Sequence, residues 1–379
     1  MSGGMELYLH MPFCVRKCAY CDFLSFPSGA ETQRMYAKRL MEDIDVMGKR
    51  YGEIPVETIF IGGGTPSVPD SGLIVEIMEH VRHAFHVADG AEISMEANPG
   101  TVTREKLTDY RKAGINRLSF GLQSANDREL KLLGRIHTWA EFLESFTLAR
   151  ECGFANLNID LMSALPGQTC ESWKETLSRV TDLDPEHISA YSLIIEEGTP
   201  FGERYGSEEG RKLLPDEDSE REMYHETKRF LKDCGYERYE ISNYAKPGRE
   251  CRHNIGYWTG VPYLGLGLGA SSYLDGCRFT VNPDMKQYLE EKPGIFADIE
   301  KLTKKDMEEE FFYVGLRMTA GVSLSEFERR FGISAKEVYP GLMETFVKEK
   351  AARFEGDRFV LTDYGLDVSN YIMAQFLQD

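Results

Sequence analysis

The first half of the chain alternates short β-rich runs with longer segments that have a helical pattern. Six such runs occur between residues 6 and 193: Leu7–His10, Thr58–Ile61, Ile93–Glu96, Leu118–Gly121, Leu157–Asp160 and Ile188–Tyr191. The segments between them place apolar residues four apart, as at Leu73, Ile77 and Val81, so each presents one apolar face to a sheet. Repeated βα units predict an α/β protein with a partial (β/α)6, TIM-like barrel.

Polar or glycine-rich groups follow these runs where the strands should end. Gly62-Gly63-Gly64-Thr65 follows the second run, Glu96 ends the third, Gln123 follows the fourth and Asp160 ends the fifth. Each group alone has an ordinary explanation, such as a turn, a helix cap or a strand end that meets water. In barrels of this kind, however, the reacting groups come from the carboxyl ends of the strands. Their recurrence predicts a site there.

The loop after the first run holds three thiols, Cys14, Cys18 and Cys21, spaced C-x-x-x-C-x-x-C. Thiols this close do not readily pair into an unstrained disulfide framework, but three thiolates can hold one inorganic centre. Iron–sulfur cubanes normally have four Cys ligands, so three would leave one iron without a protein ligand. The alternative is a tetrahedral zinc site completed by His10, although structural zinc usually draws its ligands as two pairs.

The residue types at the strand ends suit a polar ligand that resembles an amino acid. A triple glycine lets a ligand approach the backbone, whose N–H groups can bind a carboxylate. Glu96 can accept hydrogen bonds from a ribose diol, and Gln123, Arg135 and Asp160 can surround a second zwitterionic ligand. Gly265–Gly269 lacks the full dinucleotide fingerprint, and no Walker-type G-K-[ST] occurs, so neither motif supports a dinucleotide or ATP.

A second feature is the sequence His253-Asn254-Ile255-Gly256-Tyr257-Trp258. An imidazole is a normal axial ligand of haem iron, and aromatic faces suit a flat macrocycle. Cys251 is a rival ligand, since thiolates also bind haem iron. The alternative is that His253 bonds to a neighbouring loop while the two aromatic residues fill the core. We expect the following segment, Gly260–Gly269, to be flexible.

The last part of the chain, from about Thr303, predicts an α+β domain that resembles a winged helix. We expect a helix over 306–318, a capping box between Ser323 and Glu326, a helix over 335–350, a hairpin over 353–361 and a closing helix from about Asp363. Its basic residues are few, so we expect it to cover the active site or to meet a partner. The predicted domains are a core over 1–235, a linking segment over 236–300 and this domain over 301–379.

The composition of the chain limits which partners it can bind and where in the cell we expect it. The chain has 379 residues with 44 Lys and Arg against 62 Asp and Glu, a net charge of −18, which argues against nucleic acid as a partner. No basic start precedes an apolar run, and no stretch of some 18 apolar residues occurs, so we expect a cytoplasmic protein without stable membrane insertion. Transient binding to a membrane would require a protein partner. A homodimer is left open.

With Tyr20 just before the third Cys, the Cys loop resembles the signature of the radical S-adenosylmethionine (SAM) superfamily. From Tyr8 onward the chain resembles the family of oxygen-independent coproporphyrinogen III dehydrogenase and its HemW-type haem chaperone relatives. The segments that carry the resemblance are 7–14, 62–67, 119–124, 158–162 and 165–169. The resemblance implies that Cys14, Cys18 and Cys21 hold a 4Fe-4S cluster. It implies two sets of SAM contacts: Tyr8, Gly63 and Glu96 for the chelated molecule, and Tyr20, Gly64, Thr65, Gln123, Arg135 and Asp160 for a second position.

Two departures from the dehydrogenase pattern indicate the branch. A fourth Cys would stand at position 23, where this chain has Phe23, and the dehydrogenases carry some tens of residues before the motif, which here begins at Cys14. The chaperone branch has Cys-Asp-Phe and H-N-x-x-Y-W, both present here at 21–23 and 253–258. The resemblance therefore implies a haem chaperone that uses His253 as its haem contact and passes haem to respiratory haemoproteins. A true dehydrogenase and a zinc-stabilised binding protein are the alternatives.

Overall fold

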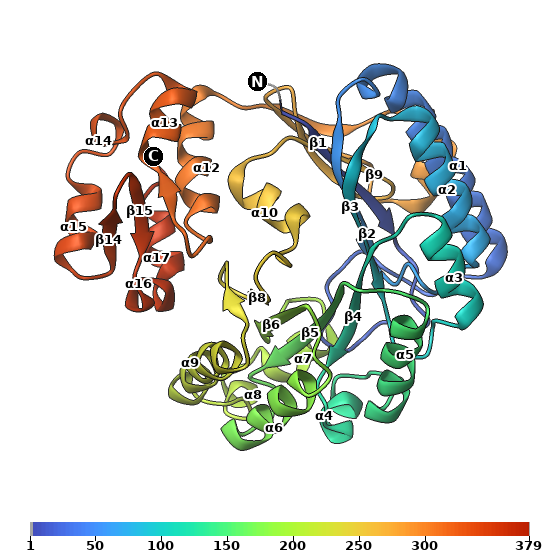
Figure 1. Ribbon diagram of the computed structural model, residues 1–379, viewed down its shortest axis with the longest axis horizontal. Coiled ribbons are helices and arrows are strands. Elements are labelled where there is room, and N and C mark those ends of the chain that lie inside the picture. Colours follow the sequence, from blue (N-terminus) through green and yellow to red (C-terminus); the bar gives the residue numbers. More distant parts are fainter. Residues whose placement is uncertain (1–2, 379) are drawn as a thin grey trace.

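A computed structural model describes residues 3–378, and its centre is a run of six parallel strands (Figure 1). They pair in chain order: β1 (Met5–Met11), β2 (Val56–Gly63), β3 (Val87–Ala97), β4 (Arg117–Gln123), β5 (Leu157–Ser163) and β6 (His187–Ser192). Each overlaps one of the six predicted runs, so this part of the prediction is confirmed. Parallel strands covered on both faces are apolar along most of their length, which is why the sequence reveals them.

Helices cover the outer face of the curved sheet, as Figure 1 shows for the blue and green segments. They are α1 (Ala30–Tyr51), α2 (Ser71–Ala84), α3 (Arg104–Lys112), α4 (Asp127–Leu132), α5 (Trp139–Glu151) and α6 (Cys170–Thr181). In α2, the Asp70 side chain caps the helix by accepting from the Gly72 N–H, and Ile74, Ile77 and Val81 are fully buried. Burying each such side chain contributes roughly 1.5–3 kcal/mol, which holds the helix on the sheet.

Further strands extend the sheet at both edges. Beside β1 lies β9 (Tyr263–Leu266), which is parallel to it, followed by antiparallel β10 (Ser271–Leu274), β11 (Cys277–Thr280) and β12 (Ala297–Lys301). The expectation of a flexible segment over 260–269 is therefore wrong. A Cβ on Gly265 would lie 2.1 Å from the Ser271 carbonyl oxygen, so this glycine permits close packing between strands rather than motion.

At the other edge, β6 pairs with antiparallel β8 (Asn243–Ala245), and β8 pairs with β7 (Glu237–Arg238). Only two residues of the segment 236–241 form a strand, β7. The Glu240 carboxylate accepts from the Ser242 N–H at 2.8 Å and from Asn243 Nδ2 at 2.7 Å, which turns the chain back at this point.

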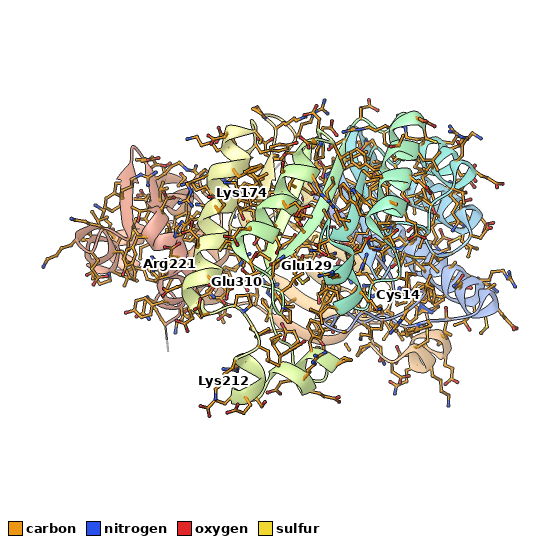
Figure 2. All side chains as sticks on the ribbon, turned by 90° about the horizontal axis from the view of Figure 1, so that it is seen from below. Cys14, Glu129, Lys174, Lys212, Arg221 and Glu310 are labelled. Carbon is orange, nitrogen blue, oxygen red and sulfur yellow. The ribbon has the colours of Figure 1, made fainter. Side chains whose placement is uncertain are left out.

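The remaining helices of this part are α7 (Pro200–Tyr205), α8 (Glu208–Arg211), α9 (Glu217–Asp233), α10 (Arg252–Thr259) and α11 (Met285–Glu290). The excursion that carries α7 and α8 projects from the body of the molecule, as Figure 2 shows at Lys212. Helix α10 lies inside the crescent of the sheet (Figure 1). Its Trp258 ring is covered by the Arg317 guanidinium, 4.4 Å from the ring centroid, so α10 also contacts the C-terminal part.

The C-terminal part has its own apolar core around Phe312, Phe327 and Phe376. Its elements are α12 (Lys304–Gly315), β13 (Val322–Ser323), α13 (Leu324–Phe331), α14 (Ala335–Val338), α15 (Leu342–Lys348), β14 (Ala352–Glu355), β15 (Arg358–Leu361), α16 (Asp363–Asp367) and α17 (Ser369–Ala374). The three strands form an antiparallel sheet in the order β13-β15-β14. The predicted fold class, a partial barrel with a C-terminal α+β domain, is confirmed.

One C-terminal prediction needs correction. The single helix expected over 335–350 is two helices, α14 and α15. Pro340 disfavours a helical residue before it, and Gly341 has a φ of +75°, so the chain turns between the two helices. Among residues 3–378, no helix is long and apolar enough to span a membrane. The division at 235 and 300 stays a prediction, although residues 236–300 add strands to the barrel's own sheet.

Candidate functional site

The loop with the three cysteines lies between β1 and α1 and is fixed by backbone hydrogen bonds from three sides. The Cys14 N–H donates to Phe26 O at 3.2 Å, and the Ala19 N–H donates to Leu133 O at 3.0 Å. The Phe201 N–H at the start of α7 in turn donates to Ala19 O at 2.9 Å. The loop has no helix or strand of its own, yet the segments around it define its path.

The three thiols lie near one another at this loop. None is in a disulfide, and each is partly exposed. Burial raises the pKa of the Cys21 thiol, and the charges of Cys18 and Cys14 raise it further. Mutual repulsion of this kind is what a bound cation or iron cluster would relieve.

The glycine turn after β2 packs directly against the Cys loop. The Gly64 N–H donates to Met11 O at 2.9 Å, and the Thr65 N–H donates to Phe13 O at 2.7 Å. Gly63 has a φ of +105°, and a Cβ there would lie 2.2 Å from the His10 ring. Only glycine allows this close approach, so the turn and the loop form one unit.

Two half-buried carboxyl groups, Glu96 and Asp160, stand behind this turn. Glu96 Oε2 accepts from the Gly63 N–H at 3.0 Å. Burial, together with the nearby Asp160 charge, raises the pKa of Glu96 to about 8, so this carboxyl is mostly protonated at pH 7. Asp160 accepts from Ser119 Oγ at 2.9 Å and from Asn158 Nδ2 at 2.8 Å, and burial raises its pKa. Hydrogen bonds therefore hold both carboxyl groups in place. A cationic ligand nearby would favour their charged forms.

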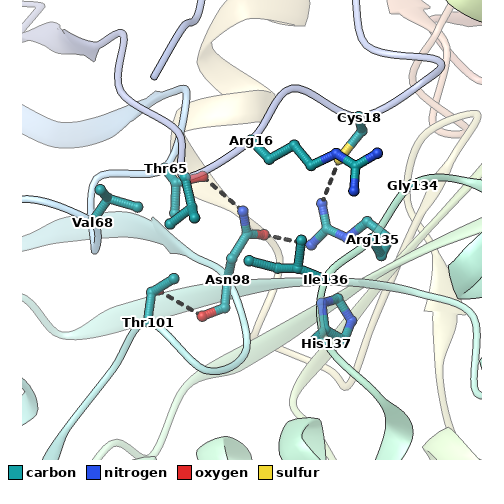
Figure 3. Close-up of a pocket in the computed structure, with 11 residues that line it drawn as sticks. Arg16, Cys18, Thr65, Val68, Asn98, Thr101, Gly134, Arg135, Ile136 and His137 are labelled. Carbon is teal, nitrogen blue, oxygen red and sulfur yellow. Dashed lines mark hydrogen bonds between the residues drawn. The ribbon is translucent and has the colours of Figure 1, made fainter. Parts of the chain in front are cut away.

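Arg135 joins the cysteine loop to the ends of β3 and β4 (Figure 3). Its Nη1 lies 3.5 Å from Cys18 Sγ, and its Nη2 donates to Asn98 Oδ1 at 2.6 Å and also to Gly121 O. Asn98 Nδ2 donates to Thr65 Oγ1 at 2.7 Å, and that hydroxyl lies 3.5 Å from Cys14 Sγ. A polar chain thus runs from one cysteine to another along one wall of a pocket.

Asn98 is a site residue to which sequence reasoning gave no role. It stands in the segment Glu96-Ala97-Asn98-Pro99, which the sequence places after the third strand, so its position was visible but its partners were not. Its amide bonds to both Thr65, just after β2, and Arg135, in the loop after α4. Such pairings depend on the fold and carry no local sequence signal.

The other predicted SAM contacts lie at the same end of the barrel. Gln123 ends β4 with a φ of +74°, a conformation that non-glycine residues rarely adopt and that is often found at functional sites. Tyr20 is half-buried beside Arg135, and Tyr8 lies in β1 with its ring stacked on Phe60. The structure therefore brings together the residues that the sequence named, namely Tyr8, Tyr20, Gly63, Gly64, Thr65, Glu96, Gln123, Arg135 and Asp160.

The side chains fit an iron cluster better than a single zinc ion. His10 Nε2 donates to Leu24 O at 2.9 Å, so its Nδ1 accepts from the Tyr8 hydroxyl at 3.0 Å. Neither nitrogen is left as a fourth zinc ligand. Within residues 3–378, no three His, Cys, Asp or Glu side chains converge closely enough for one ion. Three thiols without a fourth side-chain ligand suit an iron–sulfur cluster that keeps one iron open.

His253 lies at the opposite ends of the strands, near the starts of β2 and β3. Its Nδ1 is 2.6 Å from Thr58 Oγ1 and its Nε2 is 3.1 Å from the Tyr257 hydroxyl. The side chain is 1% exposed, and burial lowers its pKa to about 3. Both nitrogens of the neutral ring are engaged, so binding of haem iron by His253 would require α10 to move. This contact stays a prediction.

Cys251, the rival haem ligand, is also enclosed. It is fully buried, and burial raises the pKa of its thiol to about 12, so it is not a thiolate at neutral pH. Its Sγ lies 3.5 Å from Glu92 Oε1. That carboxylate also accepts from the backbone N–H groups of Arg252 and His253, which fixes the start of α10 inside the barrel.

Comparison with known proteins agrees with this geometry. The model of the radical SAM superfamily matches residues 8–180, and that of the HemN C-terminal domain matches residues 302–368. A protein of Bacillus subtilis (strain 168) named heme chaperone HemW is 35% identical, over 98% of each chain. This chain belongs to the HemW family. The superfamily implies a 4Fe-4S cluster and SAM, which is what the Cys loop of this HemW-family chain was predicted to bind.

Other relatives extend the comparison. The heme chaperone HemW of Escherichia coli (strain K12) is 35% identical to this HemW-family chain, over 99% of this chain and 98% of the relative. Among solved structures, coproporphyrinogen III oxidase (HemN) of Escherichia coli has a TM-score of 0.84 and covers 99% of this chain and 90% of its own, at 24% identity. That likeness establishes the fold alone.

Proposed function

We propose that this chain is a haem chaperone: it binds haem, keeps a 4Fe-4S cluster and SAM at the cysteine loop, and passes haem to respiratory haemoproteins. The observation that carries the proposal is the full-length likeness, at 35% identity, to proteins named heme chaperone HemW. Haem would be cargo, and the chain would work in the cytoplasm, reaching a membrane only through a protein partner.

Cys14, Cys18 and Cys21 would hold the cluster, which supplies an iron without a protein ligand for the amino and carboxylate groups of SAM. The residues around it have separate tasks. The N–H groups of Gly63, Gly64 and Thr65 already donate within the chain, so the carbonyl groups of the glycine turn would accept from the SAM ammonium, and Glu96, which is held by the Gly63 N–H, would contact the ribose. Arg135, Asn98 and Thr65 hold the loop against the ends of β3 and β4.

The second candidate is a coproporphyrinogen III dehydrogenase, favoured by the shared fold with coproporphyrinogen III oxidase over 99% of this chain. Against it stands position 23, where the dehydrogenase pattern has a fourth Cys. Phe23 occupies it here, with 68% of its surface exposed beside the cluster loop. An exposed aromatic side chain there cannot replace the thiol, so we place this function second.

The deciding experiment uses the intact chain, purified without oxygen. Titration with ferric haem should give a saturable haem absorption band, and incubation of the loaded chain with a haem-free respiratory haemoprotein should move the band to the acceptor. Coproporphyrinogen III with SAM and a reductant should yield no protoporphyrinogen IX. Turnover of coproporphyrinogen, or a failure to bind haem, would overturn the proposal.

The haem contact at His253 needs a separate titration. Replacement by Ala should shift the haem band if α10 moves on binding and exposes the imidazole to iron. Tyr257→Phe is the matched control, because it removes one hydrogen-bond partner of the ring but leaves the nitrogens in place. An identical band in His253→Ala and the unmodified chain would show that this histidine is not the ligand, and Cys251→Ala then tests its rival.

A further inference from the structure

A second concavity, which we call the basal pocket, lies at the ends of the strands opposite the cysteine loop. It has a volume of about 540 Å³ and lies between the start of β3, the turns before β4 and β5, and the loop that leads into α10. The first residues of α10 border it, through Arg252 and Ile255. None of the predicted cluster or SAM contacts lines it.

Three arginines from separate elements line this pocket. Arg111 comes from α3, where its guanidinium lies 5.3 Å from the centroid of the Phe154 ring and its Nη1 donates to Ile115 O. Arg252 begins α10, donates from Nη1 to Gly90 O at 3.0 Å and pairs through Nη2 with the half-exposed Glu57 carboxylate at 3.2 Å, a pair that a propionate would have to replace or share. Arg249 stands in the preceding loop, and its side chain makes no hydrogen bond or ion pair within the described part of the chain. Two of the three are thus held in place, and the third is free to bind a ligand.

The charges around the pocket suit a dicarboxylate. Of its two acidic residues, Glu92 already accepts from the N–H groups of Arg252 and His253 and faces the interior. The other, Glu250, accepts from the Gly248 N–H. On a chain with a net charge of −18, an anion needs a local group of cations to bind, and arginine pairs with carboxylates in two-point contacts.

The rest of the wall is small or apolar. Ala91, Ala155 and Ile255 line the pocket together with glycines that expose backbone, so a flat ring can approach closely. The pocket also adjoins the helix that carries His253, two residues before Ile255. A ligand seated here with its acidic edge on the arginines would press on the helix whose movement is needed to free that imidazole.

We propose that the basal pocket is the entry site for haem, with Arg111, Arg249 and Arg252 binding its two propionates; this rests on the proposed chaperone function. The porphyrin edge lies against the start of α10, and the site is separate from the cysteine loop. The chemistry that it recognises is a pair of carboxylates on a flat apolar ring.

The test compares ferric haem with its dimethyl ester, in which both propionates are blocked. The unmodified chain should bind haem more tightly than the ester by about tenfold or more. The variant Arg111→Glu/Arg249→Glu should lose that advantage, while its affinity for the ester stays unchanged. Arg249→Glu alone should show a smaller loss and guards against misfolding of the double variant. The control is Arg34→Glu/Arg128→Glu, which changes the net charge equally at exposed positions away from the pocket.

The outcomes separate the pocket from the proposed function. If the unmodified chain binds no haem, the chaperone function itself fails. If it binds haem and its ester equally, or if both pocket variants bind haem as the control does, the function stands but the arginines do not bind propionates. A loss in the control equal to that in the pocket variant would show that only overall charge matters, which also overturns the proposal.

Discussion

Nη2 of Arg135 donates to Oδ1 of Asn98 at 2.6 Å, and this bond joins the loop after α4 to the loop after β3 beside the cysteine loop. The same guanidinium reaches Cys18 Sγ and the Gly121 carbonyl oxygen. The acceptors around this half-buried charge hold it in place. Arg135 therefore links three segments of the candidate site.

Replacing Arg135 by Gln should weaken SAM binding by about tenfold, the scale expected for loss of charge-assisted hydrogen bonds. Iron content should change little, because the cysteines remain. The measurement is equilibrium dialysis of SAM against oxygen-free protein, with the exposed Arg128→Gln as control. Unchanged SAM affinity in Arg135→Gln would remove this residue from the site.

The three cysteines should be equally necessary for the cluster. Cys14→Ser, Cys18→Ser and Cys21→Ser should each reduce bound iron from roughly four per chain to well below one, because two thiolates do not retain a cubane. Cys234→Ser, at an exposed position far along the chain, should keep its iron. Iron analysis and visible absorbance after oxygen-free reconstitution measure both. Full iron in any one of the three loop variants would contradict the ligand assignment.

Asp43 should be a major source of stability outside the site. It is buried, and it accepts from Arg39 Nη1 at 2.7 Å, from the Tyr288 hydroxyl at 2.8 Å and from the Gly294 N–H at 2.8 Å. Asp43→Ala leaves the buried Arg39 unpaired and should lower the free energy of unfolding by about 3–5 kcal/mol. Asp45→Ala, which removes a half-exposed pair with His80, should cost under about 1 kcal/mol. Urea unfolding of both variants tests the difference.

Glu6 should make stability depend on pH. It is 2% exposed, and burial raises its pKa from 4.5 to about 8. Between these two values the folded chain holds a proton that the unfolded chain has released, so stability is highest below pH 4.5 and falls as pH rises through 8. The fall attributable to this group is on the order of a few kcal/mol.

In Glu6→Gln, which has no proton to lose, the fall in unfolding free energy between pH 5 and pH 8 should be smaller than in the unmodified chain. The exposed Glu53→Gln serves as control and should leave the pH dependence unchanged. Chemical unfolding at a series of pH values provides the comparison. Equal slopes in Glu6→Gln and the unmodified chain would show that Glu6 is ionised in the folded state.

The sequence predicts what depends on local pattern. The six parallel strands appear as apolar runs, and the cysteine loop and the glycine turn appear as motifs, because their chemistry requires adjacent residues. The break between α14 and α15 was readable as well, since Pro340 and Gly341 are poor helix residues. Taking 335–350 as one helix gave too little weight to these two residues.

Long-range packing accounts for what the sequence did not show. The burial of His253 depends on Thr58 of β2 and Glu92 of β3, which lie more than 150 residues away in the sequence. The same holds for β9. The glycines around this strand predicted a flexible segment, but β9 pairs with β1, and Gly265 allows close packing there. Asn98 is a third case, since its partners come from the turn after β2 and the loop after α4. No local pattern carries such contacts.

The most direct test of the account is electron paramagnetic resonance of the reduced, oxygen-free chain with and without SAM. The account predicts the signal of a reduced 4Fe-4S cluster that changes when SAM is added, because one iron has no protein ligand. Absence of a cluster signal, or a cluster signal that SAM leaves unchanged, would contradict the assignment of Cys14, Cys18 and Cys21 on which the candidate site is built.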